Sequence, residues 1–60
     1  MINTILRVGD LVEWMTDRGI ERGRIEEIVG FHAKVSYGLW DDEMWLSLGH
    51  LTLMVNTKAR

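Results

Sequence analysis

The sequence predicts an all-β domain, built as a small, closed or nearly closed barrel of five short strands. Apolar and polar residues alternate over several short segments, which is the side-chain period of a strand. Glycines separate these segments at short intervals and leave little room for a stable helix. Closing the sheet would also hide strand edges that a chain this short has few other means of covering.

The length and composition of the chain limit what can stabilise this fold. Sixty residues make a single domain, residues 1–60, and a domain of this size buries only about 60% of the surface that its unfolded chain exposes. Disulfides, a metal or self-association usually assist such small cores. The chain has no cysteine, and its two histidines, His32 and His50, are too few and too far apart for a structural zinc site. We therefore expect no metal and no cofactor, and either a well-packed core or association with another chain.

The charge and hydropathy of the chain point away from DNA and membranes. The formal net charge is -2, whereas non-specific binding to DNA depends on phosphate neutralisation by a basic face. No apolar run approaches the roughly 18 to 20 residues that span a bilayer. Residues 1–7, a weakly patterned lead-in, lack the basic leader and long apolar core of a signal peptide. We expect a cytoplasmic protein that does not bind membranes.

The first strand is predicted over residues 11–15. Val12 and Trp14 share one of its faces. A helix over 10–18 is the alternative, since the apolar residues there also fit a period near 3.6. We prefer the strand because glycines bracket the segment closely. Residues 16–21 follow as a polar loop, which is long for a hairpin and is therefore a candidate functional loop.

The second and third strands are predicted to form a hairpin over residues 24–37 that turns at residues 30–31. Glu26 and Glu27 are adjacent, so one of them would face inward in a regular strand. A bulge or strong bend resolves this conflict, and small barrels need such bends to close. The clearest alternation in the chain covers 33–37. We expect this hairpin to be scaffold, with four apolar side chains in the core: Ile25, Ile28, Ala33 and Val35.

The fourth strand is predicted over residues 43–48, with Trp45 facing away from the core. Residues 47–51 could instead close as one turn of 3₁₀ helix. A fifth strand is predicted over 52–55, and residues 57–60 are interpreted as a frayed polar tail. The apolar side chains of the fourth strand that face the core are Met44, Leu46 and Leu48.

Four segments occur in an order that resembles the SH3-like barrel group, which includes Tudor and KOW domains. In this group, a strand with G-D-x-V is followed by G-x-[IV]-x-x-I, by a V-x-[VF] strand, and by a short turn before an apolar strand. The resemblance covers residues 8–55 and implies a five-stranded SH3-like barrel. The matching segments are residues 9–12, 23–30, 33–35 and 46–51.

The resemblance to Tudor domains implies a candidate aromatic cage. Tudor-type domains hold methylated lysine or arginine between aromatic side chains on the first and third loops, because aromatic faces attract such cations. Trp14, Tyr37 and Trp40 fall near those positions. The alternative is that Trp14 and Tyr37 are core aromatics.

The resemblance to KOW domains implies a candidate nucleic-acid contact, because KOW-type domains bind RNA or ribosome-associated proteins. Four acidic residues are interspersed among the cations concerned, so we favour a mixed, solvated face. Plasmid-type dihydrofolate reductases use a similar barrel, but the glutamine and tyrosine of their V-Q-I-Y motif are missing from residues 44–47, so their activity is not carried over. The cations are Arg18, Arg22, Arg24 and Lys34.

The sequence does not point to catalysis, and we expect the protein not to be an enzyme. Ser47 and His50 are three residues apart, but no positioned acid or oxyanion loop accompanies them. The acidic run over 41–43 is interpreted as a solvated loop, because consecutive strand residues face opposite ways and cannot share a cation. A monomer this small also lacks the depth for a ligand pocket of about 300 Å³ or more.

Exposed tryptophan is the remaining functional signal. Trp40 lies in a loop over 38–42 and Trp45 faces out, and tryptophan is enriched at binding hot spots. The alternative for Trp45 is that it covers the barrel end or the N-terminal segment. We predict a non-enzymatic module that binds a protein partner or self-associates through these two side chains. Trp14 and Tyr37 are further candidates, and a KOW-like domain that binds RNA or DNA is the alternative function.

Overall fold

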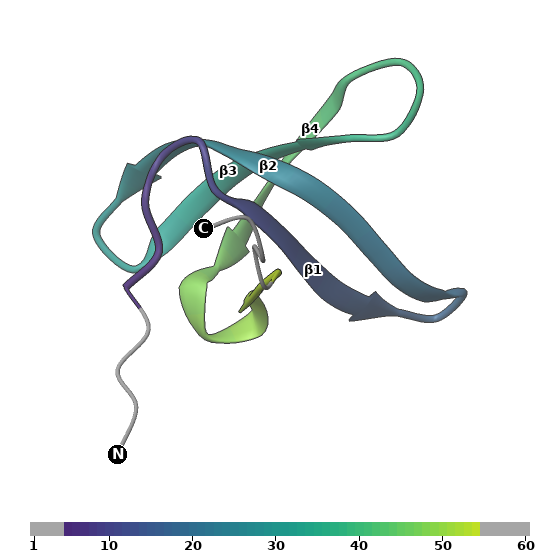
Figure 1. The fold of residues 1–60 in the computed structure, drawn as a ribbon, viewed down its shortest axis with the longest axis horizontal. Helices are drawn as coiled ribbons and strands as arrows, with labels where there is room; N and C mark the ends of the chain where they lie inside the picture. The colour runs from purple at the N-terminus through teal and green to yellow at the C-terminus, as the bar shows by residue number, and fades with distance from the viewer. Residues whose placement is uncertain (1–4, 55–60) are drawn as a thin grey trace, which may run out of the picture.

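The described part of the chain, residues 5–54, forms an antiparallel β-sheet of five strands with one short helix. A computed structural model describes residues 5–54 (Figure 1). The elements are β1 (Leu11–Thr16), β2 (Gly19–Val29), β3 (His32–Tyr37), β4 (Asp42–Ser47), the 3₁₀ helix η1 (Leu48–His50) and β5 (Thr52–Leu53). The strand order is β4-β3-β2-β1-β5. The all-β prediction is confirmed, and the helical alternative over 10–18 is wrong, because β1 and a tight turn occupy that segment.

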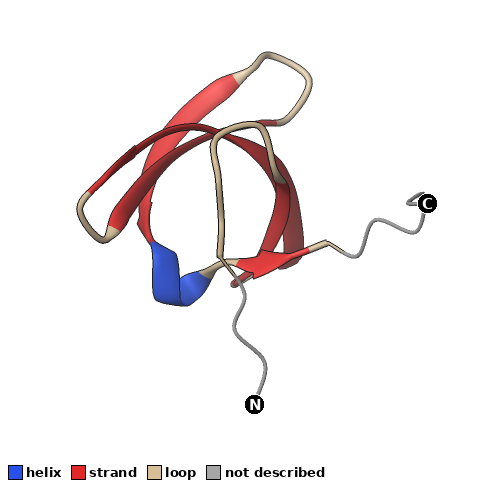
Figure 2. Cartoon of the chain, turned by 60° about the vertical axis from the view of Figure 1, so that its left-hand side comes forward, coloured by secondary structure: helices blue, strands red, loops and turns tan. Residues whose placement is uncertain are grey.

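The longest strand, β2, joins the two halves of the sheet. Residues 19–24 pair with β1, and residues 23–29 pair with β3. The pairing with β3 shifts register between Ile25 and Glu27, which leaves Glu26 as the extra residue of a bulge and confirms the predicted bend. The sheet curls strongly as a result (Figure 2).

The sheet is open between its two end strands. Within residues 5–54, β4 and β5 do not pair with each other, and each pairs with a single neighbour. The five-stranded antiparallel sheet is therefore established, whereas the closed barrel is not confirmed.

The core lies on the inner face of this curved sheet. Alternate residues of the central strands are buried, as a period of two requires, and the predicted core positions Ala33 and Val35 are completely so. Burying a valine or isoleucine side chain contributes about 1.5–3 kcal/mol. Five further apolar side chains, Ile28 and Leu46 among them, are half-buried against the core. The buried set is Val12, Trp14, Ile25, Ala33, Val35 and Leu51.

The predicted polar loop over 16–21 is wrong, because β1 and β2 are joined by a two-residue turn. Thr16 pairs directly with Gly19, whose φ of 113° suits glycine. The Thr16 hydroxyl donates to the Gly19 carbonyl (2.8 Å) and accepts the N–H of Arg18 (3.1 Å). These bonds close the turn locally, and the residues assigned to the loop therefore begin β2.

The segment that follows β4 forms the predicted 3₁₀ turn. Ser47 caps η1 by accepting the N–H of Gly49 on its hydroxyl (3.3 Å). The next strand, β5, is shorter than the predicted 52–55, although the Met54 N–H still donates to the Leu11 carbonyl (3.0 Å). The residue 55 end of that prediction and the predicted tail over 57–60 lie outside the described residues.

The segment before β1 is described from residue 5, so only part of the predicted lead-in can be compared. Leu6 is half-buried and packs against the core. The side chain of Asp10 accepts the N–H of Arg7 (2.8 Å), and the Gly9 N–H donates to the Ile25 carbonyl (2.8 Å). No helix within residues 5–54 has the length and hydropathy needed to cross a membrane.

Candidate functional site

The β3–β4 turn carries the most exposed large apolar side chains of the described chain. Tyr37 pairs with Asp42, so residues 38–41 form the turn. Gly38 and Asp41 both have positive φ, 79° and 54°. Leu39 and Trp40 lie between them with 93% and 83% of their surface exposed. We call this pair the aromatic tip. Because a sharp turn offers no inner face, neither side chain has a core to enter.

Trp45 lies on the outer face of β4, as predicted. Its cross-strand partner is Lys34, and 47% of its surface is exposed. The inner-face residue Met44 is also 38% exposed, so β4 presents apolar surface on both of its faces. This is unusual for an edge strand, which natural proteins generally keep polar or charged.

Trp14 and Tyr37 belong to the core region, and the structure brings them together. Their ring centroids are 5.8 Å apart with an interplanar angle of 88°, an edge-to-face contact. Trp14 is only 5% exposed, and Tyr37 is half-buried. Trp40, the third residue of the candidate cage, makes no ring contact with either within residues 5–54. Trp14 therefore presents no open aromatic face to a cation.

The four candidate nucleic-acid contacts are separated and partly neutralised. Arg22 pairs with Glu13 (3.3 Å). Lys34 Nζ lies 3.6 Å from Glu27 and 3.9 Å from Glu43. These contacts leave Arg18, in the β1–β2 turn, and Arg24, on the outer face of β2, without an ion pair inside residues 5–54.

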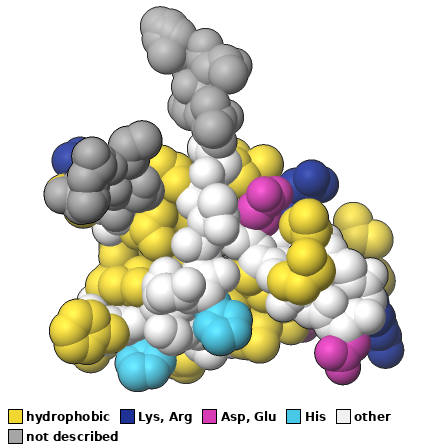
Figure 3. Space-filling view, turned by 90° about the horizontal axis from the view of Figure 1, so that it is seen from below, with side chains coloured by type: hydrophobic (Ala, Val, Ile, Leu, Met, Phe, Trp, Pro, Cys, Tyr) yellow, Lys and Arg dark blue, Asp and Glu magenta, His cyan; other side chains and the backbone are white. Residues whose placement is uncertain are grey.

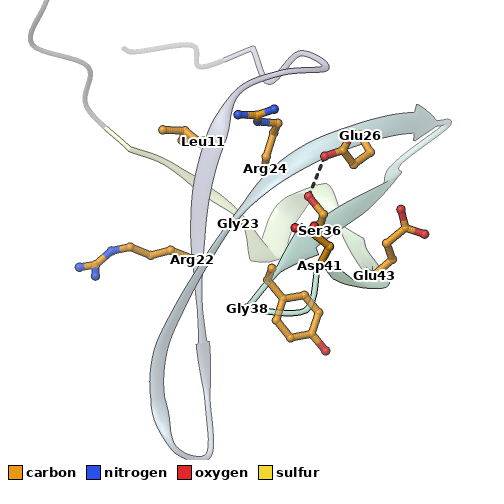
Figure 4. A pocket seen from close by; sticks show the side chains of 10 residues that line it. Leu11, Arg22, Gly23, Arg24, Glu26, Ser36, Gly38, Asp41 and Glu43 are labelled. Atoms are coloured by element: carbon orange, nitrogen blue, oxygen red, sulfur yellow. Dashed lines mark hydrogen bonds between the residues drawn. The ribbon is translucent and has the colours of Figure 1, made fainter.

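An open groove of about 580 Å³ crosses the outer face of the sheet. The groove is open to solvent along its length rather than a deep pocket, so the expectation that the domain lacks the depth for a ligand pocket stays a prediction. Figure 4 shows Leu11 and Arg24 on one side of Ser36 and Glu43 on the other, with Asp41 drawn next to Ser36. The Ser36 hydroxyl donates to a Glu26 carboxylate oxygen (2.6 Å). The lining thus combines arginines with three carboxylates, Glu26, Asp41 and Glu43.

The serines and the acidic residues weighed for catalysis and metal binding make local contacts in the structure. The Ser47 hydroxyl is engaged with the backbone of η1, and the Ser36 hydroxyl is bonded to a carboxylate. Across residues 5–54, no three His, Asp or Glu side chains gather in a way that would hold a metal ion. These polar groups are used for local structure.

Some exposed apolar residues were not singled out by the sequence. Leu39, inside the predicted loop over 38–42, is 93% exposed, and Phe31, in the β2–β3 turn, is 82% exposed. Met15 and Ile20 face each other across the β1–β2 hairpin on the outer face, and both are exposed. An apolar residue inside a short glycine-containing turn is the signal that identifies the first two, because such turns have no buried side. Figure 3 shows hydrophobic side chains reaching the surface at several separate places.

No protein-family model matches this chain, and neither the curated proteins nor the solved structures contain a significant match to it. The residues and their geometry therefore carry the functional argument.

Proposed function

We propose that this protein is a non-enzymatic interaction module that binds a protein partner through the aromatic tip. The exposure of Leu39 and Trp40 at the end of a hairpin is the observation that carries the proposal. Large exposed apolar side chains mark interaction sites when they are grouped, and tryptophan is among the residues that dominate binding energy. A tip that projects from the sheet (Figure 1) can enter a pocket of the partner.

The proposal includes an SH3-like barrel and a cytoplasmic location. Support for the first comes from the order of elements, in which β1 lies between β2 and β5 and a short 3₁₀ turn precedes β5. The strong curl of the sheet is in keeping with it (Figure 2). Support for the second is limited to the cysteine-free sequence, which suits a reducing compartment.

The test compares two aromatic residues in two turns. Trp40→Ala removes the ring from the aromatic tip, and Phe31→Ala removes a ring of nearly equal exposure from the β2–β3 turn. Proteins captured by the immobilised wild-type chain should be lost with Trp40→Ala and kept with Phe31→Ala. Capture of the same proteins by both variants would contradict the proposal. Circular dichroism should show that both variants keep the fold, because neither ring is buried.

A further inference from the structure

We propose that the chain forms a symmetric dimer in which the free edge of β4 pairs antiparallel with β4 of a second copy, with Trp45 on the two-fold axis. This goes beyond the proposed function, because it names a second copy of the chain as a partner and assigns it a surface separate from the aromatic tip. The surface is the outermost strand of the sheet, which runs from the β3–β4 turn to η1 (Figure 2).

The backbone of β4 has groups directed away from β3. Residues in an antiparallel pair alternate between hydrogen-bonded and non-hydrogen-bonded positions. The Leu48 N–H donates to the Phe31 carbonyl (2.8 Å), and the register continues without a break through β4. Even-numbered residues of β4 therefore bond to β3, and odd-numbered ones direct their N–H and C=O groups to the free edge. These are Glu43, Trp45 and Ser47.

The part of this edge centred on Trp45 lacks the usual protection against pairing. Natural edge strands carry charged residues, proline or a bulge, or are very short. The charged residues of β4, Asp42 and Glu43, are its first two, whereas residues 44–47 include no charge and no proline, and the register with β3 shows no bulge. The opposite edge of the sheet, β5, has two residues, which is too short to offer a comparable ladder. The edge of β4 is therefore the one suited to strand addition.

The sequence of β4 is complementary to itself in one register. A two-fold axis perpendicular to the sheet pairs residues of equal parity, which keeps outer side chains with outer ones. Centring the axis on Trp45 places each Trp45 beside its counterpart, each Glu43 beside Ser47 of the other copy, and each inner-face Met44 beside Leu46. Cross-strand pairs of aromatic or apolar residues stabilise a sheet by about 0.2–1 kcal/mol each.

Registers in which the two-fold axis is shifted along β4 give less favourable cross-strand pairs. Moving the axis to Met44 sets Glu43 beside the tryptophan of the other copy and Asp42 beside Leu46. Moving it to Leu46 pushes Glu43 beyond the end of the facing strand, opposite residue 49 in η1. The centred register uses all three outward-directed backbone positions and places no two like charges opposite each other.

The chain lends itself to a cysteine test of this register because it contains no cysteine of its own. Glu43→Cys and Ser47→Cys each place one thiol on the edge and leave Trp45 in place. In the proposed dimer the two thiols of a mixed pair lie on residues with Cα atoms about 5.5 Å apart, within the range for a disulfide. Two copies of the same variant hold their thiols about 13 Å apart along the strand, which is too far.

Mild oxidation of an equimolar mixture should therefore give disulfide-linked heterodimer, identified by mass spectrometry, in at least about tenfold excess over the homodimers formed by each variant alone. Equal yields from the mixture and the single variants would overturn the register. A disulfide yield no higher than that of the same variants oxidised in the unfolded state would overturn the pairing.

The solution mass separates this inference from the proposed function. Light scattering after gel filtration should give twice the monomer mass for the wild type and for Trp40→Ala. Trp45→Lys, which brings two positive charges together at the axis, should raise the dimer dissociation constant at least about tenfold while circular dichroism shows an unchanged fold. A monomeric wild type at millimolar concentration, or an assembly larger than a dimer, overturns the inference. Loss of the dimer in Trp40→Ala but not in Trp45→Lys also overturns it and assigns self-association to the tip.

Discussion

β3 and β4 have the same length and lie side by side in the sheet, but they play different parts. Both are six residues long and they pair with each other along their whole length. The inner residues of β3, Ala33 and Val35, are completely buried, whereas Met44 on β4 is 38% exposed. The difference arises because β3 has a strand on each side and β4 has one. Alternation in a sequence thus determines which face a side chain occupies, and the place of the strand in the sheet determines how deeply it is buried.

The largest expected loss of stability comes from a substitution at the closely packed centre of the sheet. Gly23 of β2 pairs with both β1 and β3. A Cβ atom there would collide with the backbone oxygen of Ser36 and lie 3.0 Å from the ring of Trp14. Because a backbone atom cannot move aside cheaply, Gly23→Ala should lower the free energy of unfolding by about 3 kcal/mol, at the upper end for overpacking.

Urea denaturation measures this change, and Gly49→Ala is the matched control. At Gly49 the nearest atom to an added Cβ is Ser47 Oγ, at 3.7 Å, so the control should lose well under about 1 kcal/mol for steric reasons. Equal losses in both variants would show that the centre of the sheet is no more tightly packed than η1, which contains Gly49.

The next effect compares the two strands directly. Val35 and Met44 are cross-strand neighbours on the inner face, and Val35 is completely buried. Val35→Ala should lower the free energy of unfolding by about 2 kcal/mol, from lost burial and the cavity left behind. Met44→Ala should cost less than about half of that in dilute monomer, because the methionine is already partly in water. Urea denaturation of both variants at low protein concentration decides the comparison, and a larger loss at Met44 would contradict it.

The same contrast explains what the sequence could and could not predict. Alternation correctly predicted the inner positions Ala33 and Val35, and two adjacent glutamates correctly predicted the bulge at Glu26, because both follow from a period of two. The sequence does not show how short the turn after β1 is, because the side-chain hydrogen bonds of Thr16 that close it depend on the direct pairing of Thr16 with Gly19. These are local features whose geometry becomes defined only when the two strands meet.

The site was harder to predict than the core. The sequence identified Trp40 and Trp45 as exposed, since one is in a turn and the other opposes three inner residues. It did not decide whether Trp14 is a core residue or part of an aromatic cage. The alternation of side chains along a strand cannot distinguish a buried face from a face that lines a cage. The edge position of β4 depends on strand order, which arises from long-range pairing that no local pattern in the sequence encodes.

The smallest expected change in stability concerns the ion pairs that Lys34 of β3 makes with glutamates on the neighbouring strands β2 and β4. Lys34 lies 3.6 Å from Glu27 and 3.9 Å from Glu43, and all three side chains are substantially exposed. Exposed ion pairs contribute about 0–1 kcal/mol, and at 1 M salt the screening length is only about 3 Å. Lys34→Gln should therefore lower the free energy of unfolding by about 0.5 kcal/mol at low salt and by nearly nothing at 1 M.

Arg22→Gln, which breaks the pair with Glu13 between β1 and β2, is the matched control for this measurement and should show the same dependence on salt. If Lys34→Gln instead loses more than about 1.5 kcal/mol at both salt concentrations, the lysine acts through its aliphatic stem rather than its charge. Trp45 is the cross-strand partner of Lys34 on the same face of the sheet. In that case side-chain packing on the outer face holds β4 to the sheet in addition to its backbone hydrogen bonds. Trp45 would then stabilise the monomer as well as any contact with a second chain.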